Sequence, residues 1–88
     1  MIFVYVIESL LDRTWYTGIA IDFLHRIAEH DQGKNRFTKR HRPWKIIFTE
    51  TRPDWPSARM REKYLKTAAG KKWLRKFLRG GDTSSLPS

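Results

Sequence analysis

The 88-residue chain contains no cysteine, which excludes disulfides and thiolate metal sites. Its three histidines lack zinc-finger spacing, and it has neither a Gly-rich phosphate loop nor a Walker pattern. Long apolar runs are missing as well. The apolar start, residues 1–7, is interrupted by Glu8 and is too short for a secretory segment or a membrane span. We therefore expect a cytoplasmic protein that does not associate with membranes.

Acidic residues are scarce in this chain. Nine Asp and Glu residues stand against 18 Lys and Arg residues, which gives a formal net charge of +9. Such an excess attracts polyanions, and the accompanying Trp, Tyr and Phe residues favour a nucleic acid as the partner. Two alternatives stay open at this point, an anionic membrane surface and a positive face that is only solvated.

The hydrophobic pattern predicts six elements in one domain over residues 1–79, followed by a flexible tail over 80–88. The expected strands cover residues 2–9, 14–20 and 44–50, and the expected helices cover residues 23–31, 57–68 and 71–79. Asp22 is expected to cap the first helix, and Gly70 to separate the last two. Because the first two strands are joined by a tight turn, they must be antiparallel. The pattern thus predicts an α+β fold, a small three-stranded antiparallel sheet flanked by helices.

Two tyrosines and two basic residues form a first candidate site. Tyr5 and Tyr16 are equidistant from the midpoint between Leu10 and Leu11, so a hairpin symmetric about that point places them opposite one another on one face. Arg26 and His30 lie one helical turn apart and project from one side of their helix. A purely structural alternative exists for each pair: a cross-strand aromatic contact for the tyrosines, and an Asp22–Arg26 ion pair with an exposed His30 for the helix.

Glu62 is the one acidic residue in the basic stretch 57–79, and it is in line with the apolar positions of its helix. A carboxylate on an inward helix face costs free energy unless it meets a cation or a metal. The spacing therefore indicates either a metal-binding or catalytic carboxylate, or an ion pair with Lys66 or Arg59.

Positive charge gathers in the loop over residues 34–45 and along the last helix. Contacts of such side chains with phosphates set affinity and salt dependence rather than sequence preference. The residues expected to bind nucleic acid are Lys34, Arg36, Lys39, Arg40, Arg42 and Lys66.

Taken in order, these segments resemble the GIY-YIG endonuclease superfamily, in its small stand-alone bacterial branch. The matching segments are Val4-Tyr5-Val6, Tyr16-Thr17-Gly18 and residues 24–30, 37–43 and 58–66. Phe3 and Val4 stand where the family name requires Gly and Ile, and Thr17 replaces the second Ile. Both tyrosines and Gly18, the chemically meaningful positions, are kept.

The resemblance implies an endonuclease that hydrolyses DNA phosphodiester bonds with one divalent metal ion. Tyr5 or Tyr16 would assist the attacking water. Arg26 would stabilise charge on the phosphate, His30 would relay a proton, and Glu62 would hold one Mg²⁺ or Mn²⁺. A single carboxylate suffices for Mg²⁺ because this ion keeps several of its waters. The alternative is a non-catalytic nucleic-acid-binding module on the same fold.

Two further expectations follow from this resemblance. The five residues should line one concave face beside the basic loop, with room for a metal and a phosphate between Arg26 and Glu62. The chain carries no obvious targeting module, so we also expect structure-selective or weakly selective cleavage, or a protein partner that supplies specificity.

Overall fold

The computed structural model describes residues 1–34 and 36–79, except the side chains of Arg36 and Phe37. Asn35 and the predicted tail, residues 80–88, lie outside the described residues. The elements in chain order are β1 (Ile2–Ser9), β2 (Trp15–Ala20), α1 (Phe23–Asp31), α2 (Arg36–Lys39), β3 (Trp44–Arg52), α3 (Trp55–Lys66) and α4 (Ala68–Leu78).

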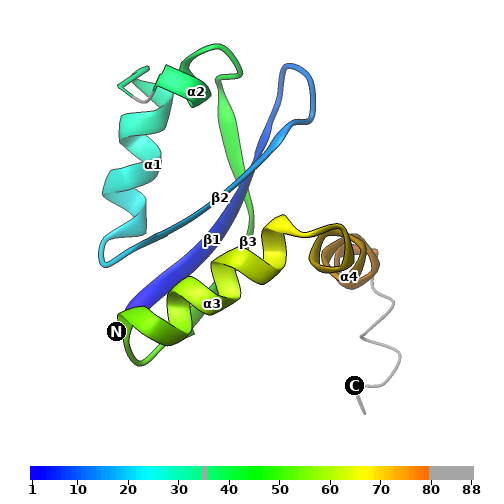
Figure 1. Ribbon diagram of the computed structural model, residues 1–88. Helices are drawn as coiled ribbons and strands as arrows, with labels where there is room; N and C mark the ends of the chain where they lie inside the picture. The colour runs from blue at the N-terminus through cyan, green and yellow to red at the C-terminus, as the bar shows by residue number, and fades with distance from the viewer. Residues whose placement is uncertain (35, 80–88) are drawn as a thin grey trace.

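The sheet is antiparallel throughout and has the strand order β2-β1-β3, with the first strand at its centre. Helix α1 covers one face, and α3 with α4 covers the other (Figure 1). The predicted α+β class, with a three-stranded antiparallel sheet flanked by helices, is confirmed. Within the described part of the chain, no helix is long and apolar enough to cross a bilayer.

Alternation along β1 divides the core into two layers. Val4 and Val6 point toward α3 and α4, where they pack with Leu65 and Leu74. Tyr5 and Ile7 point to the opposite face, where they pack with Ile27 of α1 and with Trp44. The α1 layer thus contains the phenol of Tyr5, whereas the buried residues of the other layer are apolar.

The predicted pairing of the two tyrosines is wrong by two residues. Tyr5 lies opposite Gly18, and Tyr16 lies opposite Ile7. The loop spans residues 10–13, as expected, and the Ser9 N–H bonds the Thr14 carbonyl, so the hairpin is centred one residue later than the point between Leu10 and Leu11. Arg13 in this loop adopts a positive φ of 66°. Since the shift is an even number of residues, both tyrosines still lie on the α1 face, now as diagonal neighbours.

Helix ends follow the local capping chemistry. Asp22 caps α1 through the N–H of His25, as predicted, and Asp54 caps α3 through the N–H of Ser57.

The predicted break at Gly70 is wrong, since the chain turns at Thr67, which ends α3 and caps α4 through the N–H of Gly70. Gly70 lies inside α4, where a Cβ atom would be 1.9 Å from the carbonyl oxygen of Tyr64. This glycine therefore allows the two helices to approach closely.

Candidate active site

The phenol of Tyr5 reaches under β2 because Gly18 has no side chain. A Cβ atom at Gly18 would lie 2.5 Å from the Tyr5 hydroxyl oxygen and 2.7 Å from Cζ. Tyr5 is only 1% exposed, so its ring is held between the sheet and α1. The glycine of the second strand thus admits the ring of the first-strand tyrosine.

His30 forms the centre of a buried hydrogen-bond chain. Its Nε2 lies 3.2 Å from the Tyr5 hydroxyl, and its Nδ1 lies 2.7 Å from Oγ1 of Thr38. Both His30 and Thr38 are essentially buried. Since a neutral imidazole donates at one nitrogen and accepts at the other, the chain Tyr5–His30–Thr38 has a defined direction of proton donation. The structural alternative of an exposed His30 is therefore wrong.

Burial controls the ionisation of both members of this chain. Burial raises the pKa of the Tyr5 hydroxyl far above its usual value, and the neighbouring Tyr16 adds to this. Arg26 acts in the opposite direction, while the Glu62 carboxylate raises the pKa of Tyr5 further. Burial also lowers the pKa of His30, as does the positive charge of Arg26. Tyr5 is therefore a neutral phenol and His30 a mostly neutral imidazole at neutral pH.

Tyr16 lies beside this chain but is less enclosed than Tyr5. Its ring contacts the ring of His30 edge-on, with centroids 4.8 Å apart. Tyr16 is half-buried and lines an open hollow together with Thr17 and Lys66. Of the two tyrosines, Tyr16 is thus the one that lies at the surface.

Arg26 and His30 line another hollow, different from the one beside Tyr16, together with Glu29 and Lys34. The guanidinium of Arg26 is exposed and lies 3.4 Å from the Glu29 carboxylate, an ion pair within α1. The predicted alternative partner, Asp22, instead caps the helix. Arg26 is therefore placed at the mouth of the site, where an incoming anion competes with Glu29 for its guanidinium.

Glu62 approaches the tyrosines from the other face of the sheet, on α3. Its carboxylate lies 3.1 Å from Nζ of Lys66 and is 15% exposed, so the expected i, i+4 ion pair is present. The Glu62 carboxylate contributes least among the causes that shift the pKa of Tyr5. Helix α3, which carries Glu62, covers the opposite face of the sheet from α1, which carries Arg26 and His30.

The basic loop is more structured than the sequence indicates. Residues 36–39 form the short helix α2, and Thr38 points inward to His30. Arg42 folds back onto the backbone near Gly33 and Asp31. The exposed residues Lys39 and Arg40 face solvent. The side chain of Arg36 lies outside the described residues.

Two features of the site escaped the sequence analysis. Thr38 lies in a run of cations, so it was grouped with a polar loop; its short β-branched hydroxyl is the signal that distinguishes it from its neighbours. Trp15 was assigned only to a strand, although it borders the hollow that contains Tyr16.

The donor set around Glu62 fits one kind of metal ion. Among the described residues, no cluster of three or more His, Asp or Glu side chains is arranged to hold a metal. A single, partly open carboxylate is insufficient for Zn²⁺ or for an all-protein Ca²⁺ site, but it matches Mg²⁺, which retains most of its water ligands. The residues present thus fit a hydrated Mg²⁺ or Mn²⁺ at Glu62.

The sequence matches a known class of domain. The family model of the GIY-YIG catalytic domain matches residues 1–76, which places the chain in an endonuclease superfamily. The chain belongs to the GIY-YIG family.

Relatives at moderate identity support this assignment. The chain is 35% identical over 71 residues to the UPF0213 protein YazA of Bacillus subtilis, covering 80% of this chain and 71% of YazA. It is 33% identical over 79 residues to the UPF0213 protein SERP0126 of Staphylococcus epidermidis, covering 89% and 95% of the two chains.

A solved structure shares the fold. The solution NMR structure of the UPF0213 protein BH0048 from Bacillus halodurans superposes with a TM-score of 0.54 at 31% identity, covering 100% of this chain and 99% of that one.

Proposed function

We propose that this protein is a divalent-metal-dependent DNA endonuclease, whose site comprises Tyr5, Tyr16, Arg26, His30 and Glu62. The observation that carries the proposal is the buried hydrogen bond between Tyr5 and His30, together with the hollow that His30 and Arg26 line. A tyrosine that only packed the core would not need a buried imidazole as its hydrogen-bond partner.

The two tyrosines have different roles in this proposal. Tyr16 is only half-buried, whereas Tyr5 is enclosed, so we assign the attacking water to the hydroxyl of Tyr16. Tyr5, buried and un-ionised, positions His30 through the bond to Nε2. The proton that the attacking water releases would pass to the imidazole of His30, which burial and Arg26 keep unprotonated at neutral pH.

Arg26 and Glu62 have separate roles in this proposal. The guanidinium of Arg26 would exchange Glu29 for two phosphate oxygens, which its planar fork fits bidentately. A divalent ion at Glu62 would supply Lewis-acid stabilisation of the leaving oxygen. Lys66, the ion-pair partner of Glu62, lines the same hollow as Tyr16 and would contact the DNA backbone there.

Cleavage and binding separate this proposal from its alternative, a basic module that binds nucleic acid without cutting it. In Glu62→Gln, we expect Mg²⁺-dependent cleavage to fall by about 10²–10³-fold or more, because removal of one key electrostatic stabiliser has this effect in other enzymes. DNA binding without metal should be unchanged or tighter, because one negative charge is lost. Cleavage is measured on linear, nicked, flapped and four-way DNA with Mg²⁺ and with Mn²⁺.

Glu50→Gln is the matched control, since it removes the same charge from a carboxylate that pairs with Arg52 and Arg61 instead. It should bind DNA as Glu62→Gln does but cleave as the wild type does, with unfolding midpoints recorded for both. Cleavage by Glu62→Gln at the wild-type rate would refute the nuclease proposal. The absence of wild-type cleavage on every substrate would favour the binding module.

Other parts of the hypothesis stay predictions. These are the loop cations as phosphate contacts, a protein partner that supplies specificity, a cytoplasmic location and a boundary between the domain and a tail after residue 79.

A further inference from the structure

Two hollows meet at Trp15, next to the candidate active site. The first, of about 380 Å³, is lined by Tyr16, Thr17, Lys66, Lys71 and Trp15. The second, of about 350 Å³, is lined by Glu8, Arg13, Lys71, Arg75 and Trp15. Trp15 and Lys71 border both hollows, so the two hollows adjoin at these side chains, and we call the pair the Trp15 depression.

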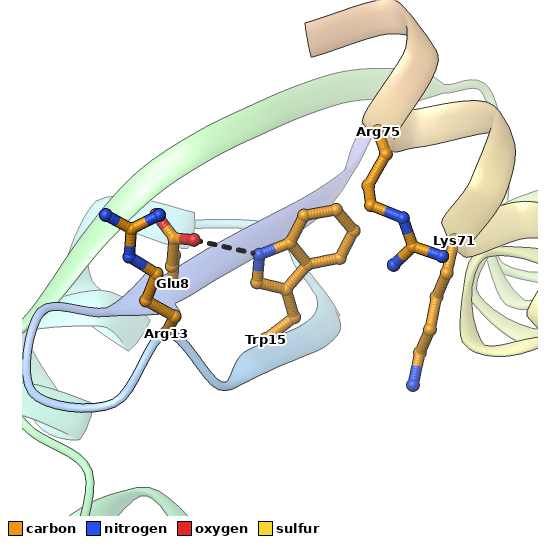
Figure 2. Close-up of a pocket in the computed structure, with 5 residues that line it drawn as sticks. All are labelled: Glu8, Arg13, Trp15, Lys71 and Arg75. Atoms are coloured by element: carbon orange, nitrogen blue, oxygen red, sulfur yellow. Dashed lines mark hydrogen bonds between the residues drawn. The ribbon is translucent and has the colours of Figure 1, made fainter. Parts of the chain in front are cut away.

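The indole of Trp15 is held in a fixed orientation within this depression. Its N–H donates to a carboxylate oxygen of Glu8 at 3.2 Å, as Figure 2 shows. Arg75 and Lys71 extend from α4 on one side of the ring, and Arg13 lies on the other side, next to Glu8 (Figure 2). The guanidinium carbon of Arg75 is 5.9 Å from the ring centroid. The ring is therefore flanked by cations on both sides.

The positive charge here is not neutralised within the fold. Glu8 is the one carboxylate lining the hollow, and it also lies 3.6 Å from Nζ of Lys45. Across residues 1–34 and 36–79, no carboxylate forms an ion pair with Lys71 or Arg75. Lys71 and Arg75, which both line the hollow beside the Trp15 indole, are thus left available for an anion.

An anion that also carries a flat apolar ring matches this surface. Nucleic acid strands combine phosphates, which Lys and Arg bind, with bases, which stack on aromatic side chains. Tyr16, which the proposed mechanism places beside the reacting water, lines one of the two hollows together with Trp15. A strand at the reacting phosphate would therefore lie within reach of Trp15.

We propose that the DNA strand flanking the reacting phosphate runs from Tyr16 over Trp15, with a base against the indole and phosphates on Lys71, Arg75 and Arg13. This inference rests on the proposed nuclease function for its starting point. It adds a binding subsite on α4 and the hairpin loop, separate from the basic loop of residues 34–45.

The test compares two double variants of α4 that lose the same charge. Lys71→Gln/Arg75→Gln removes both α4 cations from the hollow, whereas Lys72→Gln/Lys76→Gln removes exposed cations that line neither hollow. The probe is a fluorescent single-stranded DNA oligonucleotide in EDTA. For the first variant, we expect the slope of log K against log salt to decrease in magnitude by about 1.4, or roughly 0.7 per lost phosphate contact. The control should change it by less than half as much.

Two further variants keep the test falsifiable if α4 is perturbed. Arg13 has a φ of 66°, which Asn tolerates better, so Arg13→Asn should fold at least as stably while binding the oligonucleotide more weakly. Trp15→Leu should weaken binding by about fivefold or more, the lower end of base–aromatic stacking. Unfolding midpoints show whether each variant is folded.

Each outcome decides one proposal. Equal slopes for the two double variants, or unchanged binding by Arg13→Asn and Trp15→Leu, would overturn the strand path, even if the wild type cleaves DNA. Selective loss of binding in the hollow variants would support it, even if the wild type cleaves nothing. In that case the nuclease proposal alone would fail.

Discussion

Gly18 contributes to the site by having no side chain. The Tyr5 ring occupies the space in which a Cβ atom at Gly18 would lie, 2.5 Å from the hydroxyl oxygen. Because Tyr5 is also the hydrogen-bond partner of His30, the fit between glycine and ring sets the position of the imidazole. At this position, packing and candidate chemistry depend on the same two residues.

Substitution Gly18→Ala should therefore destabilise the fold by about 1–3 kcal/mol, the usual cost of overpacking. In a Tyr5→Ala background the added methyl group has room, and the same substitution should be neutral or stabilising, since alanine restricts the unfolded chain more than glycine does. A double-mutant cycle by urea unfolding measures the coupling. An equal cost of Gly18→Ala in both backgrounds would show that Tyr5 does not limit this position.

His30 predicts a pH dependence of stability with a definite sign. Its pKa is lowered in the folded protein, so near pH 6 the unfolded chain binds the proton more readily. The contribution of His30 to stability is complete above the unfolded pKa of about 6.5, and it is lost as pH falls through the folded pKa.

The free energy of unfolding, measured with urea at pH 7.5 and 5.5, should accordingly fall more steeply in the wild type than in His30→Gln. Every other side chain is the same in the two proteins, so the comparison isolates His30. The same pH slope in the two proteins would contradict the assignment.

At the scale of elements, the corner between α3 and α4 depends on one hydroxyl. Oγ1 of Thr67 donates to the carbonyl of Tyr64 at 2.6 Å and accepts from the N–H of Gly70 at 3.0 Å. It therefore satisfies one orphan group of each helix. This corner also orients α4, on which Lys71 and Arg75 lie.

Thr67→Ala should lower the free energy of unfolding by about 0.5–2 kcal/mol, the usual range for loss of an N-cap. Thr67→Ser keeps the hydroxyl and should lose much less. Thermal and urea unfolding of the three proteins test this. Equal stability of the Ala and Ser variants would show that the methyl group of Thr67, not its hydroxyl, matters.

The main elements could be predicted because their patterns are local. Dense β-branched and aromatic residues define β1, and Asp22 marks the start of α1. The hairpin register could not be predicted, because it depends on Arg13 adopting a positive φ and on the Ser9 hydroxyl accepting loop N–H groups. The α3–α4 break was misplaced for a similar reason, since both Thr67 and Gly70 are plausible breakers and only tertiary contact separates their roles.

At the scale of the molecule, the site draws on both layers around the sheet. Glu62 was recognisable from sequence because a lone negative charge interrupts a basic helix. His30 and Thr38 were not recognisable as a buried pair, because their contact joins α1 to the short helix α2, eight residues further along the chain. The burial of the site is a property of the assembled layers, whereas its residue types are a property of the sequence.

The strand order has a consequence during synthesis. β1 is made first but is the central strand, so it pairs on one side at once and on the other only when residues 44–52 have been made. The carboxylate at position 62 emerges later still. A nascent chain therefore holds both tyrosines, the guanidinium and the imidazole before it has the residue proposed to bind the metal. By the proposed function, the metal-binding carboxylate is thus the last residue of the site to leave the ribosome, and cleavage activity follows only after that.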